Sequence, residues 1–237
     1  MNSKPVLLQN RLTPFYKLLK NNLDINYRGL ENIKPGHNYI FAMNHQSIMD
    51  IPIAFSLLTP VLDHKLILFL SHKFYDFFWP VTLPLEVIRI ELYSQTEKSK
   101  KYNNHQLSRG IFKIKAGNSA LIYPEGIIRG GLNNELIRGK TGVIRLALLS
   151  KVPIIPIGIS GSNSAYPFLL KTKNPFVFHK DKKIKIKIGK RINLDRYFSV
   201  NITVQNDKNK KLLRALTDDL ITTLSELSGL PYRPEKI

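Results

Sequence analysis

The sequence predicts an α/β fold, with a single domain whose largely parallel central sheet is flanked by helices, plus an N-terminal amphipathic helical segment. Between residues 25 and 159, short apolar runs alternate with segments of helical periodicity, a pattern typical of parallel strands joined by crossover helices. The 237 residues suffice for one substantial core, and neither a repeat nor a linker divides them. We therefore expect a helical segment over residues 1–24 and one α/β domain over residues 25–237.

The N-terminal segment is amphipathic. Residues 5–20 place leucine and phenylalanine at helical spacing among lysine and arginine, although Pro14 should kink or divide such a helix. Packing on the core and contact with an anionic lipid surface both fit this pattern. We assign residues 1–24 to membrane contact.

The elements of the domain follow from periodicity and turn residues. Strands are predicted at residues 25–28, 38–43, 65–70, 87–92, 119–123 and 152–159, and helices at residues 50–58, 99–116, 140–150 and 212–227. Asp50 is a candidate N-cap of the first of these helices. In open parallel sheets, binding sites lie beyond the carboxyl ends of the strands, so the segments after residues 43 and 123 are expected at one edge.

Two further segments have more than one interpretation. Residues 182–190 alternate lysine with isoleucine, which indicates either an edge strand protected by lysines or a basic face for an anionic partner. Residues 74–85 concentrate aromatic side chains between prolines and do not fit a regular helix. They are expected to line an apolar groove, to contact a bilayer surface or to pack into the core.

Composition narrows the function classes. The net charge of +19 implies an anionic partner, such as nucleic acid, an anionic membrane, a phosphorylated substrate or an acidic carrier protein. The absence of cysteine excludes disulfides, cysteine metal sites and a cysteine nucleophile. No secretory signal is visible, and the longest uncharged run, residues 152–170, contains three prolines. We therefore expect a cytoplasmic protein without a transmembrane helix, attached peripherally to the inner face of the membrane.

His45 and Asp50 are the candidate catalytic pair. The imidazole is the side chain best suited to exchange protons at neutral pH, and a carboxylate on its other ring nitrogen orients it. On one continuous helix, residues five apart would lie about 140° apart, so the pair requires His45 in the turn before the helix. The simpler alternative is that Asp50 only caps the helix and His45 is a turn residue.

Two other motifs follow in the chain. Tyr123-Pro124-Glu125-Gly126 ends a strand and opens a basic, glycine-rich loop containing Arg129, whose backbone N–H groups and guanidinium suit a phosphate. Residues 152–159 form an apolar strand that can wall the same site.

Together these motifs resemble the 1-acylglycerol-3-phosphate acyltransferases and related glycerolipid acyltransferases. The family's Asn-His-x-x-Ser-x-x-Asp-like block is represented by residues 44–50, its Phe-Pro-Glu-Gly block by residues 123–126, and its Val-Pro-Ile-x-Pro block by residues 152–156. The order and spacing of the blocks are more specific than any one of them, and the resemblance runs from about residue 29 to residue 194.

The sequence departs from the family at two arginines. After Pro-Glu-Gly, the usual Thr-Arg-Ser is replaced by Ile127-Ile128-Arg129, and the strand at residues 87–92 lacks its terminal arginine. The family associates those arginines with the phosphate of the acceptor, so lysophosphatidate itself is in question as the acceptor. Arg129, Arg138 and Lys140 are the nearest substitutes.

The resemblance implies acyl transfer from acyl-CoA or acyl carrier protein to a lipid hydroxyl, with a lysolipid acceptor, an anionic membrane surface and no nucleic acid as partners. No metal or other cofactor is expected. His45 would act as general base and Asp50 would orient it, while Ser47 is discounted as a nucleophile. The predicted catalytic residues are His45 and Asp50, and the predicted substrate-binding residues are Asn44, Ser47, Glu125, Gly126, Arg129 and Lys140.

Two alternatives lack catalysis. A nucleic-acid-binding protein would explain the charge, but the sequence shows no helix-turn-helix, zinc spacing or RNA-binding aromatic signature. A catalytically silent membrane-binding relative would explain the altered arginines, but the presence of both His45 and Asp50 argues against it.

Overall fold

The computed structural model describes residues 21, 23–77, 85–94, 96–128, 134–166, 179–204 and 206–234. The amphipathic segment predicted at residues 5–20 therefore lies outside the described residues, as do Arg129 and most of the aromatic segment.

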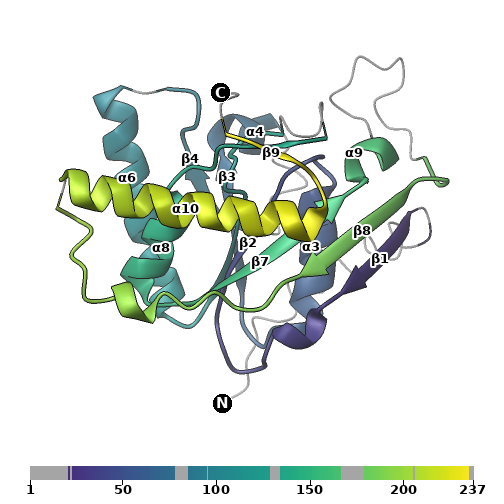
Figure 1. The fold of residues 1–237 in the computed structure, drawn as a ribbon, viewed down its shortest axis with the longest axis horizontal. Coiled ribbons are helices and arrows are strands. Elements are labelled where there is room, and N and C mark those ends of the chain that lie inside the picture. Colours follow the sequence, from purple (N-terminus) through teal and green to yellow (C-terminus); the bar gives the residue numbers. More distant parts are fainter. Residues whose placement is uncertain are drawn as a thin grey trace.

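A seven-stranded sheet forms the centre of the domain, with strand order β1-β8-β7-β2-β5-β3-β4 (Figure 1). Every neighbouring pair is parallel except β7 and β8, which are antiparallel. The largely parallel sheet predicted from the sequence is thus confirmed. Its strands are β1 Asp24–Arg28, β2 Ile40–Met43, β3 Leu66–Ser71, β4 Glu86–Ile90, β5 Ser119–Ile122, β7 Ile154–Ser160 and β8 Lys183–Ile188.

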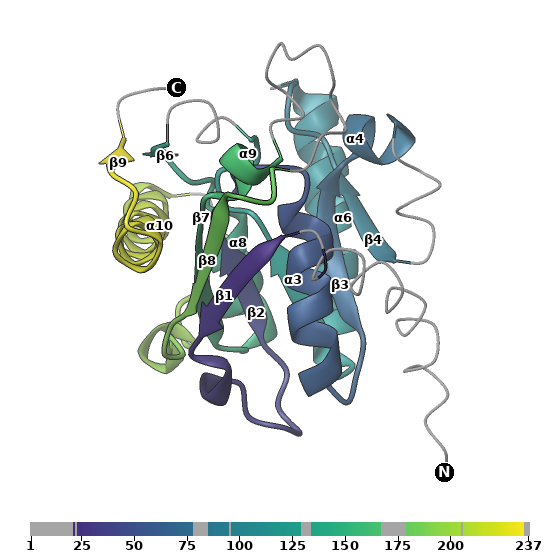
Figure 2. The same cartoon turned by 90° about the vertical axis from the view of Figure 1, so that its right-hand side faces the viewer.

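Helices cover both faces of this sheet (Figure 2). Apolar side chains of α6, α8 and α10 pack on one face, and those of α3 pack on the other. The α-helices are α3 Asp50–Leu58, α4 His72–Phe77, α6 Glu97–Lys115, α8 Gly142–Ser150, α9 Ser162–Ala165 and α10 Asp207–Ser228. Short 3₁₀ turns are η2 Leu30–Asn32, η3 Thr59–Val61 and η4 Asp195–Tyr197, and β6 Leu136–Ile137 pairs with β9 Tyr232–Arg233 in a second, two-stranded sheet.

The central strand β2 shows how the core is built. Ile40 and Ala42 point into the cluster beneath α6, α8 and α10, whereas Phe41 and Met43 point into the cluster beneath α3. Successive side chains of a strand alternate between faces, so a strand covered on both sides must be apolar throughout. Because β2 is packed on both faces, its position in the sheet is well defined, and so is that of the segment beginning at residue 44.

Strand β8 is not the edge strand that its lysines suggested. It lies between β1 and β7, and β1 occupies the edge of the sheet. The alternation itself is as predicted, because Ile184, Ile186 and Ile188 are buried while Lys183 and Lys185 are exposed. Most side chains of β1 are exposed and polar, as fits a strand at the edge of the sheet.

The aromatic segment is partly helical, contrary to the expectation for residues 74–85. Helix α4 carries the chain from His72 to Phe77, before Pro80 can interrupt it. Phe74 and Tyr75 pack against the core, and the Arg89 guanidinium lies 5.1 Å from the centre of the Tyr75 ring. Within the described part of the chain, no helix has both the length and the apolar content to cross a membrane.

Candidate active site

The candidate site lies at the carboxyl ends of three adjacent parallel strands, β2, β5 and β7. The segment after β2 supplies His45 and leads into α3, and the segment after β5 supplies Glu125. This is the position at which open parallel sheets place their ligands, as expected from the order of the motifs.

His45 and Asp50 form a buried, hydrogen-bonded pair. The distance from His45 Nδ1 to Asp50 Oδ2 is 2.9 Å, and the two residues are 7% and 0% exposed. An ionised carboxylate accepts hydrogen bonds and cannot donate them, so the proton of the neutral His45 ring lies on Nδ1. The other ring nitrogen, Nε2, is then the acceptor. In the described part of the chain, no hydrogen bond to Nε2 is formed.

Asp50 holds the turn as well as the histidine. Its Oδ2 also accepts from the backbone N–H groups of Gln46, at 2.6 Å, and Ser47, at 2.8 Å. Asp50 is not the N-cap that the sequence suggested: Met49 takes that position, and Asp50 is the first residue of α3. Its side chain turns back to the preceding loop because two unpaired N–H groups and the imidazole meet there.

Glu125 fastens this loop to the neighbouring one. Its Oε1 accepts from the backbone N–H of His45 at 3.0 Å, and its Oε2 accepts from that of Ile137 at 3.1 Å. The residue is 2% exposed. Burial, reinforced by the charge of Asp50, raises the pKa of Glu125 to about 7, even though both N–H groups favour the ionised form. Its visible role is to position His45, and the predicted substrate contact stays a prediction.

Asn44 and Ser47 anchor the same loop from the other side. The Asn44 carboxamide donates to the Ile159 carbonyl at 2.9 Å and accepts from the Ile159 N–H at 2.7 Å, joining the end of β2 to β7. The Ser47 hydroxyl donates to the Tyr166 carbonyl at 3.1 Å and accepts from the Met49 N–H at 3.3 Å. Both side chains are buried, so their predicted contact with substrate stays a prediction.

The ring of Tyr123 stacks on the imidazole of His45. The ring centres lie 4.0 Å apart, with 23° between the planes. Burial, together with the charge of Asp50, raises the pKa of Tyr123 well above its ordinary value. Its hydroxyl is buried without a hydrogen-bond partner among the residues that the structure describes. This contact was not predicted from the sequence, although Tyr123 stands where the family has phenylalanine.

Gly126, the residue after Glu125, lies against the side chain of Lys140. Gly126 has a φ of +73°, and the side chain of Lys140 passes close to its Cα, where a Cβ would come within 3.2 Å of Lys140 Cε. The Lys140 ammonium donates to the Leu92 carbonyl at 3.2 Å. Leu92 stands where the family has its strand-terminal arginine, so Lys140 brings a cation to that place. Partial burial lowers the pKa of Lys140, while the Glu91 carboxylate opposes the shift.

Three carboxamides form a polar cluster next to His45 that no local pattern predicted. Asn134 Oδ1 accepts from Gln46 Nε2 at 3.4 Å and from Asn163 Nδ2 at 2.9 Å, linking three separate segments. Among the described residues, no group of three or more histidine, aspartate or glutamate side chains is placed to hold a metal ion. Arg129, a predicted phosphate ligand, lies outside the described residues.

The chain is similar to a known protein family and to a solved structure. A family model described as Acyltransferase matches residues 24–160, more than half of the chain. Among solved structures, the 1-acyl-sn-glycerophosphate (LPA) acyltransferase PlsC from Thermotoga maritima has a similar fold, with a TM-score of 0.57 and 19% identity over 94% of this chain and 84% of that chain. No curated protein matches the sequence.

Proposed function

Because the chain belongs to the acyltransferase family, we propose that it transfers a fatty acyl group from a thioester, acyl-CoA or acyl carrier protein, to the hydroxyl of a lysophospholipid or related lipid. This activity would serve phospholipid biosynthesis or remodelling. The observation that carries the proposal is the contact between His45 and Asp50, which leaves Nε2 of a buried imidazole as a proton acceptor.

The proposed chemistry needs one base and no covalent enzyme intermediate. His45 Nε2 removes the proton of the acceptor hydroxyl while its oxygen attacks the thioester carbonyl. The tetrahedral intermediate then expels the thiolate, the carbon–sulfur bond breaks, and the imidazolium returns its proton to sulfur. Asp50 stabilises the imidazolium through Nδ1–H and keeps the ring in one tautomer. General-base catalysis of this type contributes about 10²–10⁴-fold.

The surroundings of the pair support the same reaction. Glu125 and Asn44 tie the loop that carries His45 to two neighbouring strands, so the base is held before substrate arrives. Lys140 supplies a cation beside Gly126 for an anionic head group, and Arg129 is the second proposed cation.

We further propose that the protein acts at the inner face of the membrane. The net charge of +19 favours an anionic bilayer, where each basic residue near the surface contributes about 1 kcal/mol. Flotation with anionic and neutral vesicles tests this, using wild type and a variant with Phe77, Phe78 and Trp79 changed to serine. We expect the wild type to bind anionic vesicles in a salt-sensitive manner and the variant to bind them more weakly. Unchanged binding of the variant would show that these aromatics make no contact with the membrane.

A substrate panel tests the reaction itself. Purified protein receives acyl-CoA or acyl carrier protein thioesters with lysolipids of different head groups, and free thiol and diacyl product are both followed. Transfer to at least one acceptor is expected, slower by about 10²–10⁴-fold in His45→Ala. If no acceptor is acylated while DNA or RNA forms a salt-sensitive complex, the protein is a basic binding protein without catalysis.

A further inference from the structure

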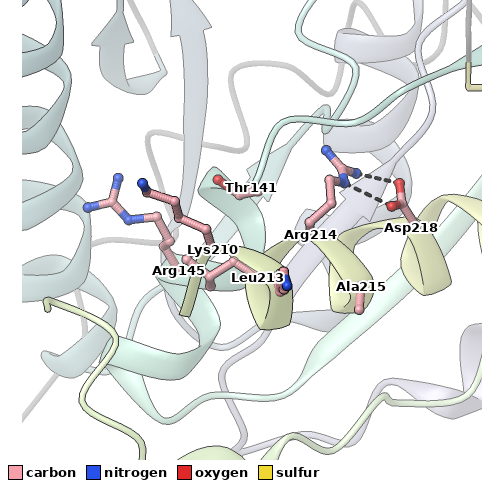
Figure 3. Close-up of a pocket in the computed structure, with 8 residues that line it drawn as sticks. Thr141, Arg145, Lys210, Leu213, Arg214, Ala215 and Asp218 are labelled. Carbon is pink, nitrogen blue, oxygen red and sulfur yellow. Dashed lines mark hydrogen bonds and ion pairs between the residues drawn. The ribbon is translucent and has the colours of Figure 1, made fainter. Parts of the chain in front are cut away.

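A basic pocket lies between α8 and the first half of α10, outside the residues that surround His45. Its volume is about 660 Å³, which is in the range of small-molecule sites. Figure 3 shows Arg145 and Lys210 extending toward the same side of the pocket, while Arg214 faces Asp218. The lining residues are Thr141, Arg145, Lys210, Lys211, Leu213, Arg214, Ala215 and Asp218.

The positive charge of this pocket is not neutralised within the described chain. Arg214 is paired with Asp218 at 2.6 Å, and Lys210 lies 3.4 Å from Asp207. Arg145 instead donates to the neutral carboxamide of Asn104 at 3.3 Å, and in the described residues neither Arg145 nor Lys211 has an acidic partner.

Arg145 is a partly buried cation without a counter-charge among the described residues. Its side chain is half-buried, and burial lowers the pKa of the guanidinium. A cation that is partly withdrawn from water and has no counter-charge is stabilised by a bound anion. The amino-terminal turn of α8, which begins beside Thr141, adds N–H groups that also favour an anion.

The pocket is joined to the catalytic loop by a short chain of contacts. Arg214 donates to the Gly139 carbonyl at 2.7 Å, and Lys140, the residue after Gly139, donates its backbone N–H to the Pro124 carbonyl at 2.8 Å. Glu125 follows Pro124 and holds His45. Four steps therefore lead from Thr141 to His45, through Lys140, Pro124 and Glu125. Each step is about the spacing of neighbouring Cα atoms or somewhat more, so Thr141 and His45 lie at most roughly 20 Å apart.

From these observations we propose that the pocket binds the adenosine 3′,5′-bisphosphate end of coenzyme A, so that acyl-CoA is the preferred thioester donor. The inference rests on the proposed function. The two phosphates match Arg145 and Lys211, which have no acidic partner among the described residues, and the exposed Ala215 adds an apolar contact for the adenine. The proposal requires the flexible pantetheine arm to reach from this pocket to His45, where the thioester is attacked.

A binding measurement tests the pocket without relying on catalysis. Isothermal titration with adenosine 3′,5′-bisphosphate compares wild type, Arg145→Gln and Lys211→Glu with Lys208→Glu, an exposed lysine of the same helix that does not line the pocket. We expect the two pocket variants to bind about 10- to 100-fold more weakly, as for loss of one charge-assisted contact, and the control to bind like wild type. Absent binding, or equal binding by all four proteins, would overturn the proposal.

A kinetic measurement links the pocket to the donor. With acyl-CoA, the pocket variants should show a KM about 10- to 100-fold higher at unchanged kcat. With acyl-pantetheine, which lacks the nucleotide, all four proteins should react alike. A loss restricted to acyl carrier protein as donor would overturn the proposal in favour of protein docking. If neither thioester reacts with any acceptor, the proposed function fails, and the titration still decides whether the nucleotide binds.

Discussion

Glu125 makes the stability of this protein depend on pH in an unusual direction. Burial raises its pKa from the ordinary 4.5 to about 7 in the folded protein. The folded state therefore retains the Glu125 proton at pH values where the unfolded chain has lost it. This contribution to stability is fully present below pH 4.5 and is lost as the pH rises through 7. The difference between the two pKa values corresponds to about 3 kcal/mol.

Other carboxylates act in the opposite direction and at lower pH. Glu86 and Asp218 have lowered pKa values, although burial opposes the shift, because Lys113 and Lys65 surround the first and Arg214 and Tyr232 bond the second. Their contribution is present above their ordinary pKa values and is lost on acidification below them. The interval between pH 4.5 and 8 therefore isolates Glu125 from these groups.

The assay is denaturant unfolding of wild type and Glu125→Gln across this interval. The difference in the free energy of unfolding, wild type minus variant, should fall by about 3 kcal/mol as the pH rises from 4.5 to 8, because the variant has no proton to lose at this site. Glu86→Gln, at a half-buried surface ion pair, is the matched control and should show no such fall. A difference between wild type and Glu125→Gln that does not change with pH would refute the reasoning.

Three kinetic and stability predictions follow from the same site. In Glu125→Gln, one carboxamide oxygen cannot serve both N–H groups, so kcat should fall with little change in the acceptor KM; a raised KM at unchanged kcat would instead make Glu125 a substrate ligand. Asp50→Asn should lower kcat by about 10²–10⁴-fold, because the backbone N–H groups take the remaining oxygen and leave the His45 tautomer unfixed; near-wild-type turnover would contradict this. Tyr123→Phe keeps the ring against His45 and removes a hydroxyl without a described partner, so thermal unfolding should be unchanged or shifted upward, whereas a loss of about 1–3 kcal/mol would reveal a partner for that hydroxyl.

Local patterns sufficed for the elements that position the site. The predicted helix at residues 50–58 has the bounds of α3, and the predicted strands before residues 44 and 124 are β2 and β5. Periodicity and turn residues act over short distances, so one sequence contains that information. The contact between His45 and Asp50 was also predictable, since they lie five positions apart and the family blocks follow in order.

Contacts between distant segments were not predictable in this way. The lysine-rich strand β8 became internal because β1, from the other end of the chain, pairs beside it. Glu125 was expected to touch substrate, but which N–H groups surround a carboxylate depends on how the loops after β2 and β5 approach each other. The pocket between α8 and α10 likewise joins residues that nothing in the local sequence relates.

The most direct test of the central claim is the turnover of His45→Ala at saturating donor and acceptor. Its control is His64→Ala, because His64 forms a comparable pair with Asp63, at 2.7 Å, and contacts Ser119 at the opposite end of β5. If His45 is the general base, kcat falls by about 10²–10⁴-fold in His45→Ala alone, while both variants unfold cooperatively. Wild-type turnover in a folded His45→Ala protein would contradict the assignment of His45 as the base.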